Sequence, residues 1–450
     1  MIALALGVYL IIQLLMNAWA ARGTNDEADY LVAGRSLGTW QVAMSIFATW
    51  FAAETVIATS AEVATTGLAG ARFEPFAYGL GLLALALIVA AKVRQGGHLT
   101  LAGFIKARFG QRAGAASASV IAVTGPIWAA AQLGALSIIV ADVAGIEVSP
   151  ALLASTALVL LYTWLGGLKG DVATDVFQGG IIVGGLLVLT ALLVLEAGGL
   201  GAAFGSIPPG QWQLNLEGES FLTRAELWLL PLFGTMVAQE AISRLLAAKD
   251  TATARKGALL GALIYTSVGL LPVFLGLVAP GLGITDAEGD RFFPSLAAEL
   301  LPPWLFVIVA GALLSAILSS VDSALLAVSA VCTELTLSWR QHFAQPKRRL
   351  ALARTATLLA AIVAALIAAS RESIRSIVFT AESIGGLMLV PLLAALFGKH
   401  QSPIPVLAAM GASLCTMIAA DWIAGLDGAY FLVITAGATA YGLSLLIKRS

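Results

Sequence analysis

The sequence has few charged residues, few histidines and few cysteines for its length. Charged side chains make up only 11% of the 450 residues, whereas hydrophobic side chains make up 59%. Three His and two Cys residues form no cluster with metal-ligand spacing, so zinc or iron chemistry is unsupported. The net charge of −1 gives no reason to expect a nucleic-acid partner. This composition excludes a soluble enzyme and predicts an all-α polytopic membrane protein.

Apolar windows of roughly twenty residues can be placed about thirteen times along the chain, and each is long enough to cross a bilayer. The first is expected to be a retained span, because no basic stretch precedes it and no convincing cleavage site follows it. The windows fall near 2–20, 40–64, 74–91, 115–143, 149–168, 173–195, 225–247, 257–279, 303–333, 352–369, 374–397, 404–423 and 429–447.

Positive charges are distributed unevenly between the segments that join these spans. If the N-terminus faces outside, the inner segments hold twenty of the 25 Lys and Arg residues, four of them in 244–256. Cytoplasmic loops of membrane proteins are enriched in these residues. We therefore expect an odd number of spans in an inner (plasma) membrane, with the N-terminus outside and the C-terminus in the cytoplasm.

Two pairs of glycines are spaced four residues apart within the predicted spans. These pairs are Gly180 with Gly184, and Gly257 with Gly261. On a helix this spacing puts both glycines on one face and lets another helix approach closely. The pattern favours close helix contact at both pairs.

Hydroxyl groups and one carboxylate interrupt the ninth span, in the sequence Gly311 to Ser329. Ala316, Ser319 and Ser320 lie at i, i+3 and i+4 on a helix, and Asp322 and Ser323 continue an overlapping face from Ser319. This arrangement can present oxygen ligands to a small hard cation. Alternatively, the hydroxyls bond carbonyls one turn back or join neighbouring helices.

The second span contains the sequence FATWFAAET at 47–55, with an ionisable Glu54 near the middle of an apolar window. Small residues on both sides favour an unwound backbone, whose carbonyls can coordinate a cation where they line a cavity. The alternative is an intact helix in which Glu54 bonds to a neighbour. In the seventh span, Pro231 and Gly234 predict a second interruption at 230–235.

Interruptions separated by five spans suggest two five-helix repeats of inverted topology, at 40–195 and 224–397. An extra N-terminal span at 2–20 and two extra C-terminal spans within 404–447 complete a single transmembrane domain of 1–450.

Five segments, in order along the chain, resemble the motifs of the sodium:solute symporter family, which has the LeuT-like fold. The resemblance covers nearly the whole chain and implies a secondary transporter that uses the inward sodium gradient to accumulate sugars, amino acids, carboxylates, vitamins or urea. The segments are DYLVAGRSLG at 29–38, FATWFAAET at 47–55, GGLKGDVATDVFQ at 166–178, SRLLAAKD with ARKGALLG at 243–261, and LSSVDSALLAVS at 318–329.

The resemblance also implies a sodium site between the first helix of the first repeat and the ninth span. Its expected ligands are the backbone carbonyls of Ala48, Phe51 and Ala316 and the hydroxyls of Ser319 and Ser320.

Some relatives hold another cation between hydroxyls of the ninth span and the acidic residue of a TDxxQ motif, which is Asp175 here. This chain departs from that pattern, because Asp322 stands where such relatives have Ser. We expect Asp175 and Asp322 to face one another and, with Ser323, to hold a second sodium ion or a proton, since two ionised carboxylates in one pocket repel. Alternatively, Asp175 is a structural first-turn acid of a helix that starts near Asp171.

In relatives the substrate lies beside the break in the first helix of the repeat. Glu382 would pair with a cationic group on the substrate, such as an ammonium, or would bond a carbonyl exposed at a Gly385–Gly386 kink while protonated. The substrate-binding candidates implied here are Glu54, Thr55, Glu74, Gln132, Gln239 and Glu382.

The sequence therefore predicts a sodium-coupled symporter that imports a small polar organic solute by alternating access. A LeuT-fold membrane sensor and a proton-coupled transporter are the alternatives. An enzyme is not expected, because no His or Cys occupies a plausible catalytic position within the spans. The expected partners are the solute and the lipid bilayer, with no obligate protein partner.

Overall fold

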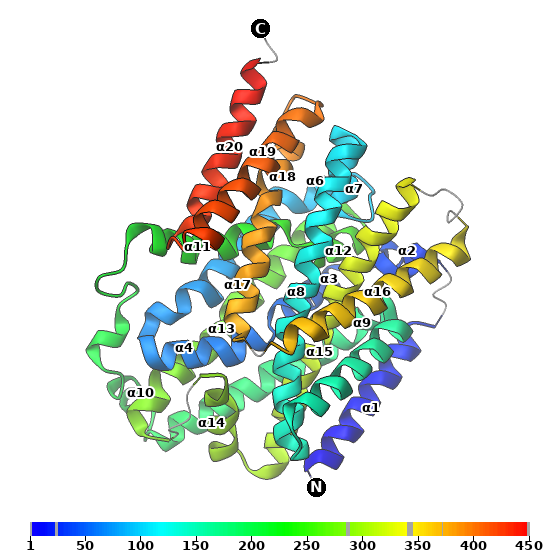
Figure 1. The fold of residues 1–450 in the computed structure, drawn as a ribbon. Coiled ribbons are helices and arrows are strands. Elements are labelled where there is room, and N and C mark those ends of the chain that lie inside the picture. The colour runs from blue at the N-terminus through cyan, green and yellow to red at the C-terminus, as the bar shows by residue number, and fades with distance from the viewer. Residues whose placement is uncertain (1, 23–25, 285–288, 340–344, 371, 448–450) are drawn as a thin grey trace.

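A computed structural model describes residues 2–22, 26–284, 289–339, 345–370 and 372–447, and these residues form an all-helical molecule (Figure 1). Its α-helices are α1 Ile2–Ala20, α2 Glu27–Val32, α3 Thr39–Trp50, α4 Thr59–Thr66, α5 Tyr78–Ala84, α6 Ala90–Gln95, α7 Leu101–Phe109, α8 Gln111–Ala144, α9 Val148–Glu196, α10 Leu200–Gly205, α11 Phe221–Val237, α12 Gln239–Ala247, α13 Thr251–Leu282, α14 Phe292–Leu300, α15 Pro303–Trp339, α16 Pro346–Ala368, α17 Ile374–Gly385, α18 Leu389–Phe397, α19 Pro403–Thr416 and α20 Ala429–Ile447.

Nine of the described helical segments are long and apolar enough to cross a membrane, or ten if the bent pair α11 and α12 is one span. The number of thirteen spans is therefore not confirmed. Part of the difference arises in α9, whose 49 residues contain a break at Gly167, where φ is 53° and ψ is −168°. A straight helix of that length would extend about 74 Å, well beyond a hydrocarbon core of about 30 Å.

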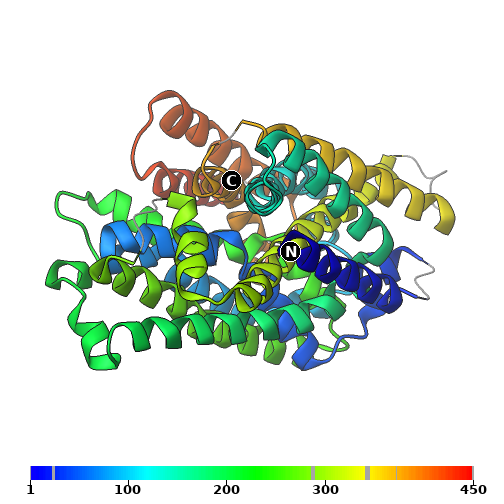
Figure 2. The same ribbon diagram turned by 90° about the horizontal axis from the view of Figure 1, so that it is seen from below.

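The helices pack around α8 and α15, which run through the middle of the bundle. Helix α15 packs on α8, α9 and α16, and α17 also packs on α8. Helix α1 packs on α9 at the lower right of Figure 1, whereas α19 and α20 pack on each other at the top. Helix α3 is largely buried, and it contacts α9, α13 and α15. In the view from below, α1 is the dark blue helix that starts at the N-terminus (Figure 2).

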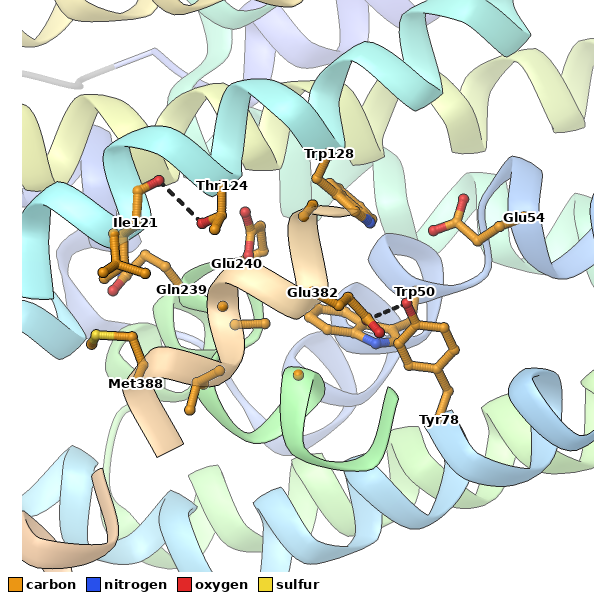
Figure 3. Close-up of a pocket in the computed structure, with 16 residues that line it drawn as sticks. Trp50, Glu54, Tyr78, Ile121, Thr124, Trp128, Gln239, Glu240, Glu382 and Met388 are labelled. Atoms are coloured by element: carbon orange, nitrogen blue, oxygen red, sulfur yellow. Dashed lines mark hydrogen bonds between the residues drawn. The ribbon is translucent and has the colours of Figure 1, made fainter. Parts of the chain in front are cut away.

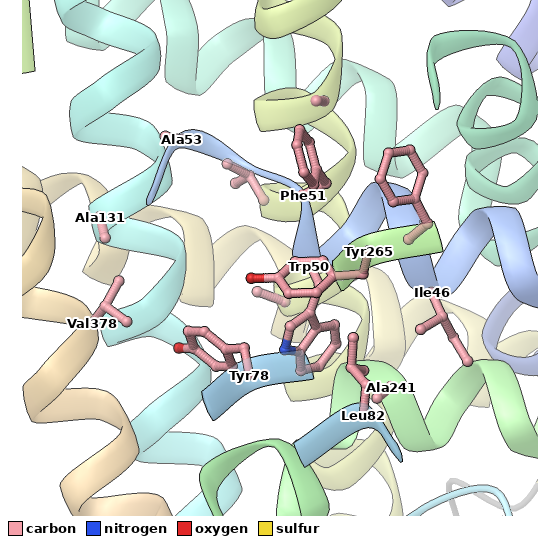
Figure 4. Packing of buried hydrophobic residues seen from close by; sticks show 14 of the residues in the cluster. Ile46, Trp50, Phe51, Ala53, Tyr78, Leu82, Ala131, Ala241, Tyr265 and Val378 are labelled. Carbon is pink, nitrogen blue, oxygen red and sulfur yellow. The ribbon is translucent and has the colours of Figure 1, made fainter. Parts of the chain in front are cut away.

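The predicted interruption at 47–55 is present. Helix α3 ends at Trp50, the next two residues are irregular, and a wide π-helical turn follows at Glu54–Ala58. Aromatic rings surround the break: the Phe51 ring lies 4.9 Å from that of Phe47 and edge-on to Tyr265 at 6.0 Å between centroids (Figure 4). This packing encloses an unwound stretch of backbone, where it is protected from lipid.

The prediction of a break at 230–235 is wrong, because α11 passes through Pro231 and ends only at Val237. Proline removes a single backbone donor, so only the carbonyl one turn earlier, that of Leu227, loses its helical partner, and the helix continues. The break falls at Ala238, where φ is −66° and ψ is 118°, and α12 begins after a bend of 41°.

A third irregular position lies at Glu74, whose backbone is extended (φ −132°, ψ 134°) at the start of the expected third span. It follows Arg72, which holds the loop before α11 through two hydrogen bonds to the Glu219 carboxylate, at 2.6 and 2.9 Å. The chain is thus irregular on both sides of the short helix α4.

The two glycine pairs differ in the structure. Close contact is confirmed for Gly257 and Gly261 on α13, where a Cβ at Gly257 would lie 2.6 Å from Val42 Cβ on α3. The prediction is wrong for Gly180 and Gly184, which are exposed and have no neighbouring atom within 4 Å of such a Cβ. They point away from the bundle, because the helical period turns the adjacent residues of α9 inward instead.

Candidate functional site

The break after α3 contains the carbonyls of Ala48 and Phe51, which the backbone hydrogen bonds of the described residues beside the break do not use. The backbone hydrogen bonds that flank the break run from Phe51 N to Phe47 O at 2.7 Å and from Val56 N to Ala52 O at 3.3 Å. Neither bond uses the carbonyl of Ala48 or Phe51, the two predicted sodium ligands in this helix. A carbonyl without a partner at membrane depth favours a cation or a polar side chain nearby.

Helix α15 brings its hydroxyl groups to this break. Ser320 Oγ donates to the Thr49 carbonyl at 3.0 Å, which joins the centre of α15 to the last turn of α3. Ala316 and Ser319 lie on the same buried side of α15. The structure therefore brings Ser320, one predicted ligand of α15, to the last turn of α3, which contains the predicted ligand Ala48; the full set of predicted ligands stays a prediction, and its oxygen donors would suit a small hard cation.

A cluster of carboxylates lies beside the same hydroxyls. Ser319 Oγ is a hydrogen-bond partner of Asp171 Oδ1 at 3.0 Å and also of Asp175. The Asp175 carboxylate accepts a second hydrogen bond from Ser45 of α3. The break at Gly167 places Asp171, and not Asp175, in the first turn of the second half of α9. The structural alternative for Asp175 as a first-turn acid therefore does not describe its surroundings.

Arg244 of α12 supplies the positive charge in this cluster. Its Nη2 lies 2.5 Å from Asp171 Oδ2 and 4.0 Å from Asp175 Oδ2, and its Nε donates to Ser45 Oγ at 3.1 Å. The same Nη2 donates to Ser323 Oγ. The assignment of Arg244 to an inner loop is wrong, because its side chain is only 1% exposed.

Asp322 is buried in α15, and neither of its carboxylate oxygens has a hydrogen-bond partner in the described part of the chain. Asp175 instead bonds Ser319 and Ser45, so the structure does not join the two aspartates directly. Within the same described residues, no group of three or more His, Cys, Asp or Glu side chains is placed to hold a metal ion.

A cavity opens next to the break in α3 (Figure 3). Of the predicted substrate-binding residues, Glu54, Gln239 and Glu382 line it, and Glu74 lines an adjoining cavity that shares Glu54. Thr55 lines neither cavity. Its hydroxyl donates to the Trp50 carbonyl at 2.9 Å and therefore stabilises the break.

Glu382 points into the cavity from α17 and accepts a hydrogen bond from the Tyr78 hydroxyl (Figure 3). Its other carboxyl oxygen has no partner among the described residues. The Glu382 side chain can lie this close to α11 because residue 234 is glycine; a Cβ at Gly234 would lie 3.0 Å from Glu382 Cδ. The alternative, a bond from Glu382 to a carbonyl at a Gly385–Gly386 kink, is not seen.

Two predicted substrate-binding residues with amide side chains, Gln132 and Gln239, form hydrogen bonds within the protein. Gln132 of α8 donates to the Glu54 carboxylate and accepts from Ala53 N at 3.4 Å, so the broken helix and a bonded Glu54 occur together. Gln239 accepts from Leu101 N at 2.7 Å and donates to Ser243 at 3.0 Å. Both ends of its side chain are thus used within the protein.

Several residues of the site were not identified from the sequence. Asp171 and Arg244 each lie inside a motif segment that was recognised, and their opposite charges in apolar surroundings were the available signal for a buried pair. The aromatic wall of the cavity carried no such signal, because aromatic residues are frequent in spans. The unpredicted residues are Asp171, Arg244, Glu240, Trp50, Tyr78 and Trp128.

Comparison with known proteins gives consistent matches over the length of the chain. The profile of the sodium:solute symporter family matches residues 30–403. The high-affinity proline transporter PutP of Bacillus subtilis is 28% identical over 423 residues, covering 90% of this chain and 89% of that protein. The high-affinity choline transporter 1 of Caenorhabditis elegans is 24% identical and covers 86% and 72%, respectively.

Among solved structures, a substrate-bound, outward-open Na⁺-coupled sialic acid symporter superposes with a TM-score of 0.83 and covers 98% of both chains. Its sequence identity of 18% means that this likeness concerns the fold alone. It confirms an all-helical, LeuT-like transporter fold.

Proposed function

The chain belongs to the sodium:solute symporter family, and on that basis we propose that it imports a small polar organic solute together with sodium by alternating access. The observation that carries the proposal is the meeting of the broken helix α3 with the hydroxyls of α15, at 3.0 Å between Ser320 Oγ and Thr49 O. Unwound carbonyls beside hydroxyls are the ligand set by which broken-helix transporters bind sodium at the bilayer midplane. Sodium is here a transported substrate.

The first sodium site uses the predicted oxygens of α3 and α15. Two of them, the carbonyls of Ala48 and Phe51, are not used by the backbone hydrogen bonds that flank the break. The other ligands in this proposal are the Ala316 carbonyl and the hydroxyls of Ser319 and Ser320, all buried.

The second proposed site, which would hold sodium or a proton, consists of Asp175, Asp322 and Ser323. The pair of Arg244 with Asp171 neutralises one carboxylate of the cluster, so it leaves Asp175 and Asp322 as the groups that need a further positive charge. The unbonded carboxyl of Asp322 favours a proton, because protonation removes the cost of burying its charge. Coupling to protons in place of sodium is therefore the second candidate function.

Alternating access is proposed to occur between the repeats 40–195 and 224–397. Each begins with an interrupted helix, at the irregular residues after Trp50 and at Ala238. The cavity lies between these two breaks, and transport would expose it first to one side and then to the other as the repeats rock. Import corresponds to the proposed orientation, with the N-terminus outside and the C-terminus in the cytoplasm of the plasma membrane.

The sodium site is tested on the purified full chain in lipid nanodiscs. Thermal unfolding is measured in sodium chloride and in potassium chloride at equal ionic strength, and sodium should raise the unfolding temperature because it binds the folded state. The double variant Ser319→Ala, Ser320→Ala should lose this difference. Ser329→Ala is the matched control, since Ser329 is also buried in α15 but bonds Ala353 on α16 at 2.8 Å. A sodium effect that survives the double variant contradicts the assignment.

Transport is tested in proteoliposomes with radiolabelled amino acids, sugars and amines. An inward sodium gradient should drive accumulation, whereas the proton-coupled alternative requires a pH gradient and no sodium. Binding of a solute without accumulation under either gradient would instead identify a membrane sensor.

A further inference from the structure

The cavity beside α3 is lined by three carboxyl groups and by no basic side chain. Glu54 follows the break, Glu240 lies in the first turn of α12 and Glu382 comes from α17, so three separate elements bring negative charge to one space (Figure 3). The adjoining cavity is lined by one described basic residue, Arg375, which already pairs with Glu62 at 3.1 Å. No described basic residue of the main cavity's lining therefore pairs with these carboxyl groups.

Two of the acidic side chains also lack hydrogen bonds on one oxygen. Glu74, in the adjoining cavity, is 3% exposed, and its Oε2 has no partner in the described chain. Glu382 Oε2 is likewise buried without a partner. Glu54, Glu74 and Glu382 lie close enough to act electrostatically on one another. Carboxylates that repel in a low-dielectric space are stabilised by a cation between them.

The remaining wall of the cavity is aromatic and apolar. The rings of Trp50 and Trp128 lie 6.4 Å apart, and Tyr78 lies beside Glu382, to which its hydroxyl donates (Figure 3). Val120 and Met388 add alkyl surface. An indole face attracts a cation whose hydration shell is weak, and alkyl groups on that cation bury apolar area against the same wall. A small inorganic ion would gain neither contact.

We propose that the solute is a small organic cation with an alkylated ammonium group, which binds between Glu54 and Glu382 against the rings of Trp50 and Trp128. This inference rests on the proposed function, because it takes the cavity to be the transport site. An anionic solute would meet three carboxyl groups and no basic partner in the described lining there. A neutral sugar would leave the carboxylates unpaired, at the cost of their desolvation.

The test compares matched probes on the wild-type chain in nanodiscs at saturating sodium, with tryptophan fluorescence as the readout. The probes are choline, tetramethylammonium, trimethylglycine, and the neutral carbon analogue of choline, in which a tert-butyl group replaces the trimethylammonium. Choline or tetramethylammonium should bind, and the neutral analogue should bind at least tenfold more weakly than choline. Equal affinity for choline and its neutral analogue, or failure of both cations to bind, overturns the proposal.

Trimethylglycine tests the charge of the site further, because it keeps the ammonium and adds a carboxylate. It should bind at least tenfold more weakly than choline. Equal binding would overturn the preference for a net cation and would indicate a zwitterion held with the help of Arg375.

Variants then locate the charge that is recognised. Glu382→Gln and Glu54→Gln should each weaken choline binding at least tenfold, whereas Glu372→Gln should not, because Glu372 is exposed just before α17. Unchanged choline affinity in both cavity variants contradicts the proposed placement.

Failure of this inference can be told apart from failure of the proposed function. A sodium-specific rise in unfolding temperature that depends on Ser319 and Ser320, together with equal binding of the charged and neutral probes, would reject the cationic solute and retain sodium coupling. Preferential binding of the cation without any sodium effect would retain the cationic solute and reject sodium coupling.

Discussion

Replacing Arg244 by Gln is expected to destabilise the folded protein by about 3–5 kcal/mol, the usual cost of breaking a buried ion pair. The side chains of Arg244 and Asp171 are 1% and 0% exposed, and Nη2 lies 2.5 Å from Oδ2. The change leaves the Asp171 carboxylate buried with hydrogen bonds from serines but without its counter-charge. The loss of the positive charge, and not of side-chain volume, should dominate the effect.

A double-mutant cycle separates the pair from its surroundings. Asp171→Asn alone should also destabilise strongly, because it leaves the guanidinium unpaired. Combined with Arg244→Gln it should recover about 2 kcal/mol or more of the summed loss, within the range of couplings measured between contacting residues. Arg349→Gln serves as the control: Arg349 is 38% exposed, pairs with Glu27 at 3.2 Å, and should cost less than about 1 kcal/mol.

The free energies of unfolding are measured by equilibrium titration with a denaturing detergent in mixed micelles, with circular dichroism as the readout. All four variants and the wild type are compared at one sodium concentration, because ligand binding shifts the apparent stability. If the two single losses add in the double variant, the ion pair is not the source of the stability and the reasoning is refuted.

Three further changes test separate features. Gly257→Ala should cost about 1–3 kcal/mol of stability, because its Cβ would meet Val42 at 2.6 Å. Gly180→Ala, in open space, should be neutral or stabilising by up to about 1 kcal/mol. Equal effects of the two changes in the detergent titration would contradict this. Hydrogen bonds from Arg72 hold the pKa of Glu219 below its ordinary value of 4.5, so this pair stabilises fully above that pH and less as the pH falls through the lowered pKa. The stability lost in Glu219→Gln should therefore shrink on acidification, and a pH-independent difference in thermal unfolding would reject the pairing. Asp322→Ser should change either the Hill coefficient for sodium, if a second sodium binds, or the pH profile of uptake, if a proton does; no change in either makes Asp322 structural.

The fold was predictable where a residue had one strong local preference. Small residues around Glu54 identified the first break, since a buried carboxylate and a helix-weakening context coincide there. Pro231 misled the prediction of the second break, because a helix tolerates the loss of one backbone donor. The actual break at Ala238 depends on how α12 packs, and an alanine carries no local signal for it. The number of thirteen spans is not confirmed, in part because the two windows 149–168 and 173–195 fall in one helical segment, α9, which is interrupted only at Gly167.

Residues of the candidate site could be predicted where they follow a regular spacing along one helix, and not where they meet from distant parts of the chain. The hydroxyls of α15 follow a helical period and could be read directly from the sequence, as could the acidic candidates near the break. The partner of Asp171 is 73 residues away in the chain, so no spacing rule links Asp171 to Arg244. The third carboxyl of the cavity, Glu240, was missed because its position depends on the bend between α11 and α12.

One hydroxyl, that of Ser319, belongs both to the proposed first sodium site and to the carboxylate cluster of Asp171 and Asp175. It has a single proton, and the carboxylates of Asp171 and Asp175 at its side draw that proton toward α9. Hydrogen bonding to a carboxylate makes the lone pairs of a hydroxyl more electron-rich. The two aspartates would therefore raise the ligand strength of this uncharged oxygen in the proposed sodium site. Neutralising Asp171 and Asp175 should then weaken sodium binding at that proposed site without altering any of its proposed ligand atoms.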